Sequence, residues 1–271
     1  MQSLCRLAIL IAATVPVLVL GGGCALMDDL GYQYNPGAQG VFGLFSRPSP
    51  AQATAWAIDE KDADKRYRGT LLLANAPFAG DEPYLELFKD NLDDPDPAVR
   101  SAAARGLAHH GLPEHVPLLV RALGDDELIV REEAARALQR VHSDAAVGPL
   151  IRRLNPETEP EPSVRQACAR ALGQYAEPRV LAALAASLRD TSLAVNRASS
   201  DSLHTLTGQD FGLDQRAWLA FIDESADPFA DQQRYVYPVF QRDRTWAEYI
   251  PLMPQPPNEP EAEPAGMPRQ E

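Results

Sequence analysis

Cysteine is scarce in this sequence, with three residues in 271, and their positions exclude a disulfide framework. Cys5 and Cys24 lie in or beside an apolar N-terminal segment, so only Cys168 belongs to the part expected to fold. Familiar catalytic and metal-binding motifs are also missing: there is no HExxH, paired CxxC, P-loop or GxSxG pattern, and no His-Glu dipeptide. The sequence therefore points to a non-catalytic protein, for which we expect no cofactor, no metal and no small-molecule substrate.

Positive charge is in deficit, with 25 Lys and Arg residues against 38 Asp and Glu residues and a formal net charge of −13. A protein of this charge repels polyanions, which excludes nucleic acid as a default partner. Hydrophobic residues make up 45% of the chain, enough to bury a core, so global disorder is excluded as well.

No N-terminal run is long enough to span a bilayer. The uncharged stretch from Leu7 to Leu20 is shorter than the roughly 20 residues that a transmembrane helix needs. It follows the single charge of Arg6 and precedes three glycines, a pattern that predicts a signal peptide over residues 1–23.

The sequence LGGGC ending at Cys24 resembles a bacterial lipobox, which implies cleavage before Cys24 and lipidation of its thiol. Gly21 stands where lipoproteins usually have leucine, so two alternatives stay open: cleavage as an ordinary secreted protein, or retention as an uncleaved anchor. A lipidated Cys24 would hold the protein to a membrane. We expect an exported protein of the cell envelope that faces the periplasm or the exterior, and Ala25 favours the outer membrane by analogy.

Two apolar trios alternate through the middle of the chain, with steps of three or four residues that place each trio on one side of a helix. The first trio recurs as Leu85, Phe88, Leu92; Val116, Leu119, Leu123; Val147, Leu150, Leu154; and Leu181, Leu184, Leu188. The second recurs as Val99, Ala103, Leu107; Val130, Ala134, Leu138; Val164, Cys168, Leu172; and Val195, Ser199, Leu203. Because only a neighbouring pair can cover the apolar side of each helix pair, the repeat predicts stacked hairpins over residues 83–207.

The motif VRxxAAxAL, present as VRSAAARGL, VREEAARAL and VRQACARAL, resembles HEAT repeats and in particular the subgroup named after phycobilisome lyases. The resemblance implies an all-α solenoid of four to five HEAT-type helical hairpins. It also implies a ladder of structural pairs between neighbouring units, formed by acidic turn residues and the arginine after each valine. The ladder acids are Asp94, Asp125, Glu159 and Asp190, and the ladder arginines are Arg100, Arg131 and Arg165. Asn196 takes the place of the arginine in the fourth unit, so we expect the ladder to end there.

The flanks divide into further segments. Residues 24–55 are predicted to form a tether after the lipidated cysteine, and residues 56–82 an N-terminal capping half-repeat. Within it, residues 62–76 align 32 positions ahead of the segment that begins at Asp94. Residues 208–250 are predicted to hold a C-terminal capping helix, with an N-cap at Asp214, followed by an extended aromatic arm. Residues 251–271, rich in Pro and Glu, are predicted to be disordered.

Aromatic residues concentrate in the arm rather than in the repeats. Two interpretations stay open for the arm: it packs along the helices, or it binds a partner. The candidate partner-binding residues are Tyr235, Tyr237, Phe240, Trp246 and Tyr249.

The five histidines and Cys168 have structural interpretations. His109, His110, His142 and His204 fall at helix ends, where a solvated or dipole-facing imidazole belongs, and His115 opens a helix. Cys168 occupies the slot filled by small residues in the other units and is predicted to pack in the core. Paired acids such as Asp93-Asp94 are expected to be solvated turn residues, with a weak cation-binding edge as the alternative.

Two functions from different classes are compatible with this reading. The first is a protein–protein interaction scaffold that is anchored at the bacterial cell envelope through Cys24 and binds protein partners there. The alternative is a bilin-lyase-like modifying enzyme, which the repeat subgroup alone implies. Export disfavours the enzyme, because such lyases act on cytosolic antenna proteins.

Overall fold

The computed structural model describes residues 48–239 and 261–268 of the chain, which divides into two compact units, Met1–Ala53 and Thr54–Glu271. Helix α2 (Pro50–Ala57) begins in the first unit, inside the segment predicted to be a tether. The helices that follow all belong to the second unit. Within the described ranges, no helix combines the length and apolar character that crossing a bilayer demands.

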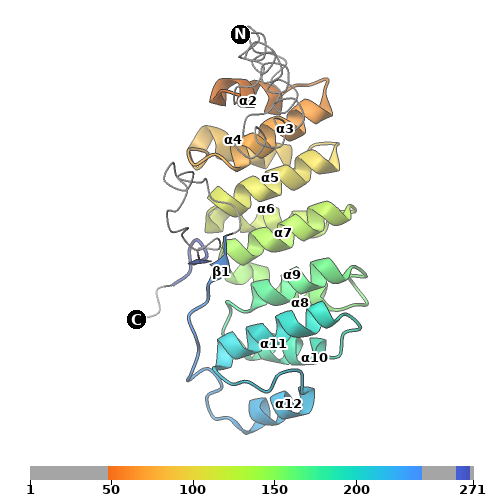
Figure 1. Ribbon diagram of the computed structural model, residues 1–271, viewed down its shortest axis with the longest axis vertical. Coiled ribbons are helices and arrows are strands. Elements are labelled where there is room, and N and C mark those ends of the chain that lie inside the picture. The colour runs from red at the N-terminus through yellow and green to blue at the C-terminus, as the bar shows by residue number, and fades with distance from the viewer. Residues whose placement is uncertain (1–47, 240–260, 269–271) are drawn as a thin grey trace, which may run out of the picture. The chain divides into compact units, whose positions relative to one another are not determined.

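The second unit is an all-α solenoid of HEAT-like hairpins, which confirms the predicted fold class (Figure 1). The first helices of the pairs are α4 (Glu82–Asn91), α6 (Val116–Ala122), α8 (Val147–Leu154) and α10 (Pro178–Ser187). The second helices are α5 (Pro97–His110), α7 (Leu128–Arg140), α9 (Pro162–Leu172) and α11 (Leu193–Thr207), and α3 (Ala63–Ala74) precedes them. Short 3-10 turns at Pro113–His115 and Asp144–Ala146 lead into α6 and α8.

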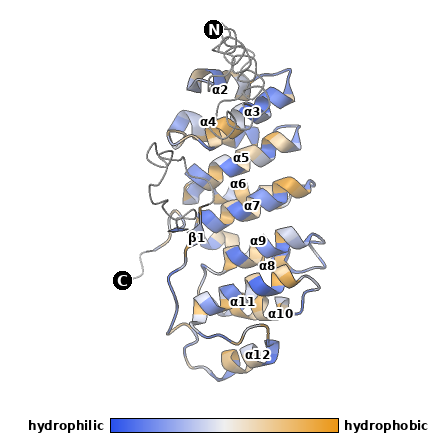
Figure 2. Cartoon of the chain, in the orientation of Figure 1, coloured by the Kyte–Doolittle hydropathy of each residue, from blue (hydrophilic) through white to orange (hydrophobic). Residues whose placement is uncertain are grey.

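The second helices pack in chain order, with α3 against α5, α5 against α7, α7 against α9 and α9 against α11. We call the side of the stack that they form the second-helix face. Figure 2 shows hydrophobic and hydrophilic residues mixed along each helix, as one buried and one exposed side require. Every residue of the predicted apolar trios is buried, which explains why the hairpins stack.

Small residues let the helices of a pair approach closely. A Cβ atom built on Gly106 of α5 would lie 2.6 Å from the ring of Phe88 in α4, which is fully buried. Any larger residue at this position would push the two helices apart. The equivalent positions of α7 and α9 hold the fully buried alanines Ala137 and Ala171.

The predicted N-terminal half-repeat contains α3, but its register differs from the one expected. Asp62 caps α3 through its carboxylate, as Asp96 caps α5, so equivalent residues are 34 positions apart rather than 32. With this offset the buried Leu73 of α3 takes the place of the buried Leu107 of α5.

The C-terminal cap has the predicted form. Asp214 accepts hydrogen bonds from the backbone N–H groups of Arg216 and Ala217 and begins α12 (Gln215–Glu224). Trp218 is fully buried, and its indole N–H donates to the carbonyl of Gly212 at 2.9 Å. Helix α12 packs against α10 and so covers the last unit of the stack.

The prediction that residues 251–271 are disordered is wrong for residues 261–268, and the rest of this range lies outside the described residues. Strand β1 (Tyr237–Pro238) pairs antiparallel with β2 (Glu261–Ala262), and Ala265 forms a parallel bridge with Val141 after α7. Ala265 N donates to the carbonyl of Arg140 at 2.8 Å, and its own carbonyl accepts from His142 N at 2.9 Å. Residues 261–268 are therefore docked on the repeats: backbone hydrogen bonds, which composition does not encode, hold them there.

Candidate functional site

The predicted ladder pairs are present between consecutive units. The Nε atoms of Arg100, Arg131 and Arg165 lie 2.8, 2.8 and 2.7 Å from carboxylate oxygens of Asp125, Glu159 and Asp190, respectively. Each arginine extends from a second helix to the acidic turn of the following unit, and a second guanidinium nitrogen completes a bidentate contact.

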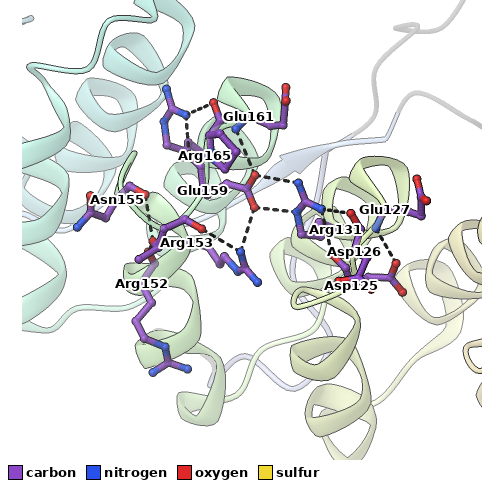
Figure 3. Close-up of polar contacts among 12 residues, drawn as sticks. Asp125, Asp126, Glu127, Arg131, Arg152, Arg153, Asn155, Glu159, Glu161 and Arg165 are labelled. Atoms are coloured by element: carbon purple, nitrogen blue, oxygen red, sulfur yellow. Dashed lines mark hydrogen bonds and ion pairs between the residues drawn. The ribbon is translucent and has the colours of Figure 1, made fainter.

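Each ladder arginine also holds the turn of its own unit. Arg131 Nη1 donates to the carbonyls of Asp125 and Asp126 at 2.9 and 2.8 Å, while its other nitrogens face Glu159 (Figure 3). The acid it pairs with also accepts from the backbone N–H two residues later, Glu161 N in this case. One guanidinium therefore ties two turns together and fixes the spacing between units.

The loop insertion of the third unit preserves the ladder. Arg100 and Asp125 are 25 residues apart, as are Arg165 and Asp190, whereas Arg131 and Glu159 are 28 residues apart. The insertion brings Glu159 to the same place, where it is fully buried and also faces Arg153 Nη1 at 3.4 Å. The extra residues are therefore accommodated without changing the register of the stack.

The structure adds one rung that the sequence reading missed. Arg66 of α3 forms a bidentate pair with Asp94, with its Nε 2.6 Å from Oδ2. The register of 32 residues hid this rung, because it aligned Arg68 with Arg100. At the other end Asn196 replaces the arginine, and its buried Oδ1 has no partner among the described residues.

The stability of the folded chain is expected to depend on pH through the ladder carboxylates. Burial acts to raise the pKa values of Asp125 and Asp190, but hydrogen bonds from Arg100, Arg165 and the backbone outweigh it and hold both below the ordinary 3.8. A carboxylate with a lowered pKa in the folded state contributes stability above its unfolded pKa, and this stability is lost as pH falls through the folded pKa.

We therefore expect the urea midpoint of the wild type to fall more steeply between about pH 5 and pH 2 than that of Asp190→Asn. Circular dichroism at 222 nm during urea titration measures both curves. Parallel curves would show that protonation of Asp190 does not contribute to the loss of stability at low pH.

The histidines make internal contacts. His109 Nδ1 and His110 Nε2 both lie within hydrogen-bond distance of the carbonyl of Ala74, and desolvation lowers the pKa of each imidazole. His115 Nδ1 accepts from Leu112 N, His142 Nδ1 faces Gln174 Oε1, and His204 Nδ1 faces the carbonyl of Gln209. No group of three His, Cys, Asp or Glu residues with metal-binding geometry occurs in the described parts of the chain.

Cys168 is fully buried, and desolvation raises the pKa of its thiol. A protonated thiol in the core is a poor nucleophile, so its role is packing, as predicted.

The arm residues have different placements. Tyr235 is buried, and its hydroxyl donates to the carbonyl of Arg170 in α9 at 2.8 Å. This contact corrects its assignment to partner binding, because the ring packs along the helices. Tyr237 is half-buried beneath the guanidinium of Arg140, 5.3 Å from its ring centre. Phe240, Trp246, Tyr249 and the candidate lipidation residue Cys24 lie outside the described residues.

The second-helix face carries a groove of about 500 Å³ between α5, α7 and α9, with Pro238 of β1 at its edge. Its charged lining contains four arginines and two glutamates, an excess of positive charge on a chain with net charge −13. Its arginines are Arg105, Arg136, Arg140 and Arg170. The sequence reading missed this groove, although arginine recurs two positions before the last leucine of three consecutive second helices.

The family comparisons match the repeats directly. Residues 85–161 match a family model described as HEAT repeats, and residues 164–190 match one described as PBS lyase HEAT-like repeat. Residues 85–161 and 164–190 are therefore built of HEAT-type repeats. The matches confirm the resemblance to HEAT repeats and to the phycobilisome-lyase subgroup; the lipobox resemblance at Cys24 stays a prediction.

Several solved structures align with part of the chain at low sequence identity. They include a designed armadillo repeat protein, with 16% identity, a TM-score of 0.46 and coverage of 67% of this chain and 94% of that chain. An engineered protein has 21% identity, a TM-score of 0.44 and coverage of 57% and 77%. The complex of CpcE and CpcF of phycocyanin lyase from Nostoc sp. PCC7120 has 21% identity, a TM-score of 0.41 and coverage of 64% and 80%. No curated protein matches the chain.

Proposed function

We propose that this protein is a non-catalytic scaffold that binds a protein partner through its second-helix face at the bacterial cell envelope. HEAT repeats generally mediate protein–protein interactions. The observation that carries the proposal is the unbroken ladder from Arg66 to Asp190, which holds consecutive hairpins in one register. Side chains from α5, α7 and α9 thereby form one preorganised surface, which lowers the entropic cost of binding.

Site-specific photo-crosslinking in intact cells tests the scaffold. A benzophenone amino acid at Gln166, which lines the groove in α9, is expected to give a discrete adduct with one protein. The matched control places the same group at Ala182, an exposed residue of α10 among the first helices. No adduct from Gln166, or the same adducts from both positions, would contradict partner binding at the second-helix face.

The proposed anchor is a lipid on Cys24. The apolar run from Leu7 to Leu20, the glycines after it and the cysteine that ends LGGGC support cleavage and lipidation at this position. A thioether-linked lipid would place the repeats beside a membrane, with the outer membrane favoured by Ala25. Mass spectrometry of the mature N-terminus is expected to show lipidated Cys24, and globomycin treatment is expected to leave the precursor uncleaved. An unmodified N-terminus beyond Cys24 would refute the anchor.

The alternative is a bilin-lyase-like modifying enzyme, favoured by the match of residues 164–190 to PBS lyase HEAT-like repeat. Incubation of the purified chain with a free bilin and an acceptor protein tests it, because covalent transfer would be visible as a shift of absorbance with the acceptor. The scaffold predicts no transfer.

A further inference from the structure

The groove on the second-helix face contains arginines without a counter-charge. Arg105 Nη2 lies 2.6 Å from Glu133, and Arg136 is bound to Glu132 and, at 2.9 Å, to Glu133. No carboxylate among the described residues pairs with Arg140 or Arg170, although both line the groove. Arg140 instead lies over the ring of Tyr237, and desolvation lowers its pKa.

The repeat explains why this charge is unbalanced. Glu133 of α7 bridges Arg105 of the preceding unit and Arg136 of its own helix. The equivalent residue of α9, three positions after Val164 as Glu133 is after Val130, is Ala167. A carboxylate at that position would face Arg170, three positions later on its own helix, as Glu133 faces Arg136. Ala167 instead leaves open space there, and it lines the groove.

We propose that a carboxylate of an acidic peptide segment, supplied by the protein partner, binds in this groove beside Ala167. Arg170 and Arg140, which line the groove and pair with no carboxylate among the described residues, would donate hydrogen bonds to it. Guanidinium groups suit this role, because their paired N–H donors match the two oxygens of a carboxylate.

Charge complementarity and the lining favour a peptide as the occupant. The chain as a whole is acidic, whereas the lining of this groove has an excess of positive charge. The groove therefore attracts a negatively charged segment. Its remaining lining includes Ala108, Ala167 and Pro238, which leave room for a main chain, and the amides of Gln139 and Gln166. The inference rests on the proposed scaffold function and specifies the chemistry of its partner.

Fluorescence anisotropy with the full chain in detergent tests the site. The probe is a short labelled peptide of alternating Glu and Ala, and its counterpart replaces Glu with Gln. We expect Arg140→Gln with Arg170→Gln to weaken binding of the Glu peptide by about tenfold or more. The matched control, Arg152→Gln with Arg189→Gln, removes the same charge at exposed positions outside the groove and is expected to change affinity by less than about twofold.

A second variant tests the position of the carboxylate. Ala167→Glu supplies the bridging group from within the chain and is expected to weaken peptide binding by about tenfold. Circular dichroism checks that each variant is folded. If Ala167→Glu does not fold, the peptide affinity of Arg140→Gln with Arg170→Gln tests the proposal alone.

Several results would overturn the proposal. These are no binding of the Glu peptide, equal binding of the Gln peptide, equal weakening in the control pair, and unchanged binding by folded Ala167→Glu. Binding that appears only after Asp243, Glu248 and Glu259 are neutralised would also overturn it, because the occupant would then be the chain's own segment.

Failure of this site and failure of the scaffold are distinguishable. A photo-adduct from Gln166 that survives Arg140→Gln with Arg170→Gln would leave the scaffold standing and refute the carboxylate site. Loss of peptide binding in that variant, with no photo-adduct from the wild type, would show that the groove binds acidic segments and would refute a protein partner as their source.

Discussion

Replacing Arg165 with Met is expected to lower the free energy of unfolding by about 3–5 kcal/mol. The side chains of Arg165 and Asp190 are only 3% and 1% exposed, so loss of the guanidinium leaves a buried carboxylate without its cation. The carbonyls of Glu159 and Pro160 lose their donor as well. Methionine keeps most of the aliphatic stem, so the effect reports on the charged group rather than on packing.

Urea unfolding followed by circular dichroism measures this loss. The control is Arg121→Met, which breaks a pair with Asp93 whose side chains are 56% and 66% exposed, and we expect a loss of about 0–1 kcal/mol. Arg165→Met combined with Asp190→Leu is expected to recover part of the stability, because no buried charge is then left unpaired. Equal losses for Arg165→Met and Arg121→Met would show that the ladder does not hold the units together.

Replacing Trp218 with Ala is expected to cost about 3–5 kcal/mol in the stability of the C-terminal cap. Trp218 is fully buried, and its ring meets Phe211 edge to face at 4.9 Å between centroids. The substitution removes this contact, leaves the carbonyl of Gly212 without its indole donor and creates a cavity beneath α12. Because units of a solenoid are stabilised by their neighbours, the loss should be felt first in α10 and α11.

Hydrogen exchange with peptide resolution measures this effect. Exchange in α10, α11 and α12 is expected to accelerate strongly, while exchange in α5 stays close to that of the wild type. Leu219→Ala, on the same helix at a side chain that is 42% exposed, serves as the control and should change little. Uniform acceleration from α5 to α12 would mean that the stack unfolds as one unit and that α12 is not a separable cap.

Local sequence patterns predicted most of the repeat. Spacings of three and four residues identified the buried side of each helix, since a helix brings such residues together whatever lies around it. The ladder of Arg100, Arg131 and Arg165 came from the resemblance to HEAT repeats, and its end at Asn196 could be read from one residue. The first rung at Arg66 was missed, because the N-terminal unit shares too few apolar residues with the others to fix its register.

The sequence by itself determined the helices, their pairing and their order in the stack, because these follow from contacts within a unit and with its immediate neighbour. Only the tertiary structure decided where the arm and residues 261–268 lie, since Tyr235 and Ala265 bind backbone groups that carry no sequence signature. It also decided that Ala167 opens a groove beside Arg140 and Arg170. The sequence shows a small residue in a repeat, but only the arrangement of the neighbouring helices shows which charged side chains surround it.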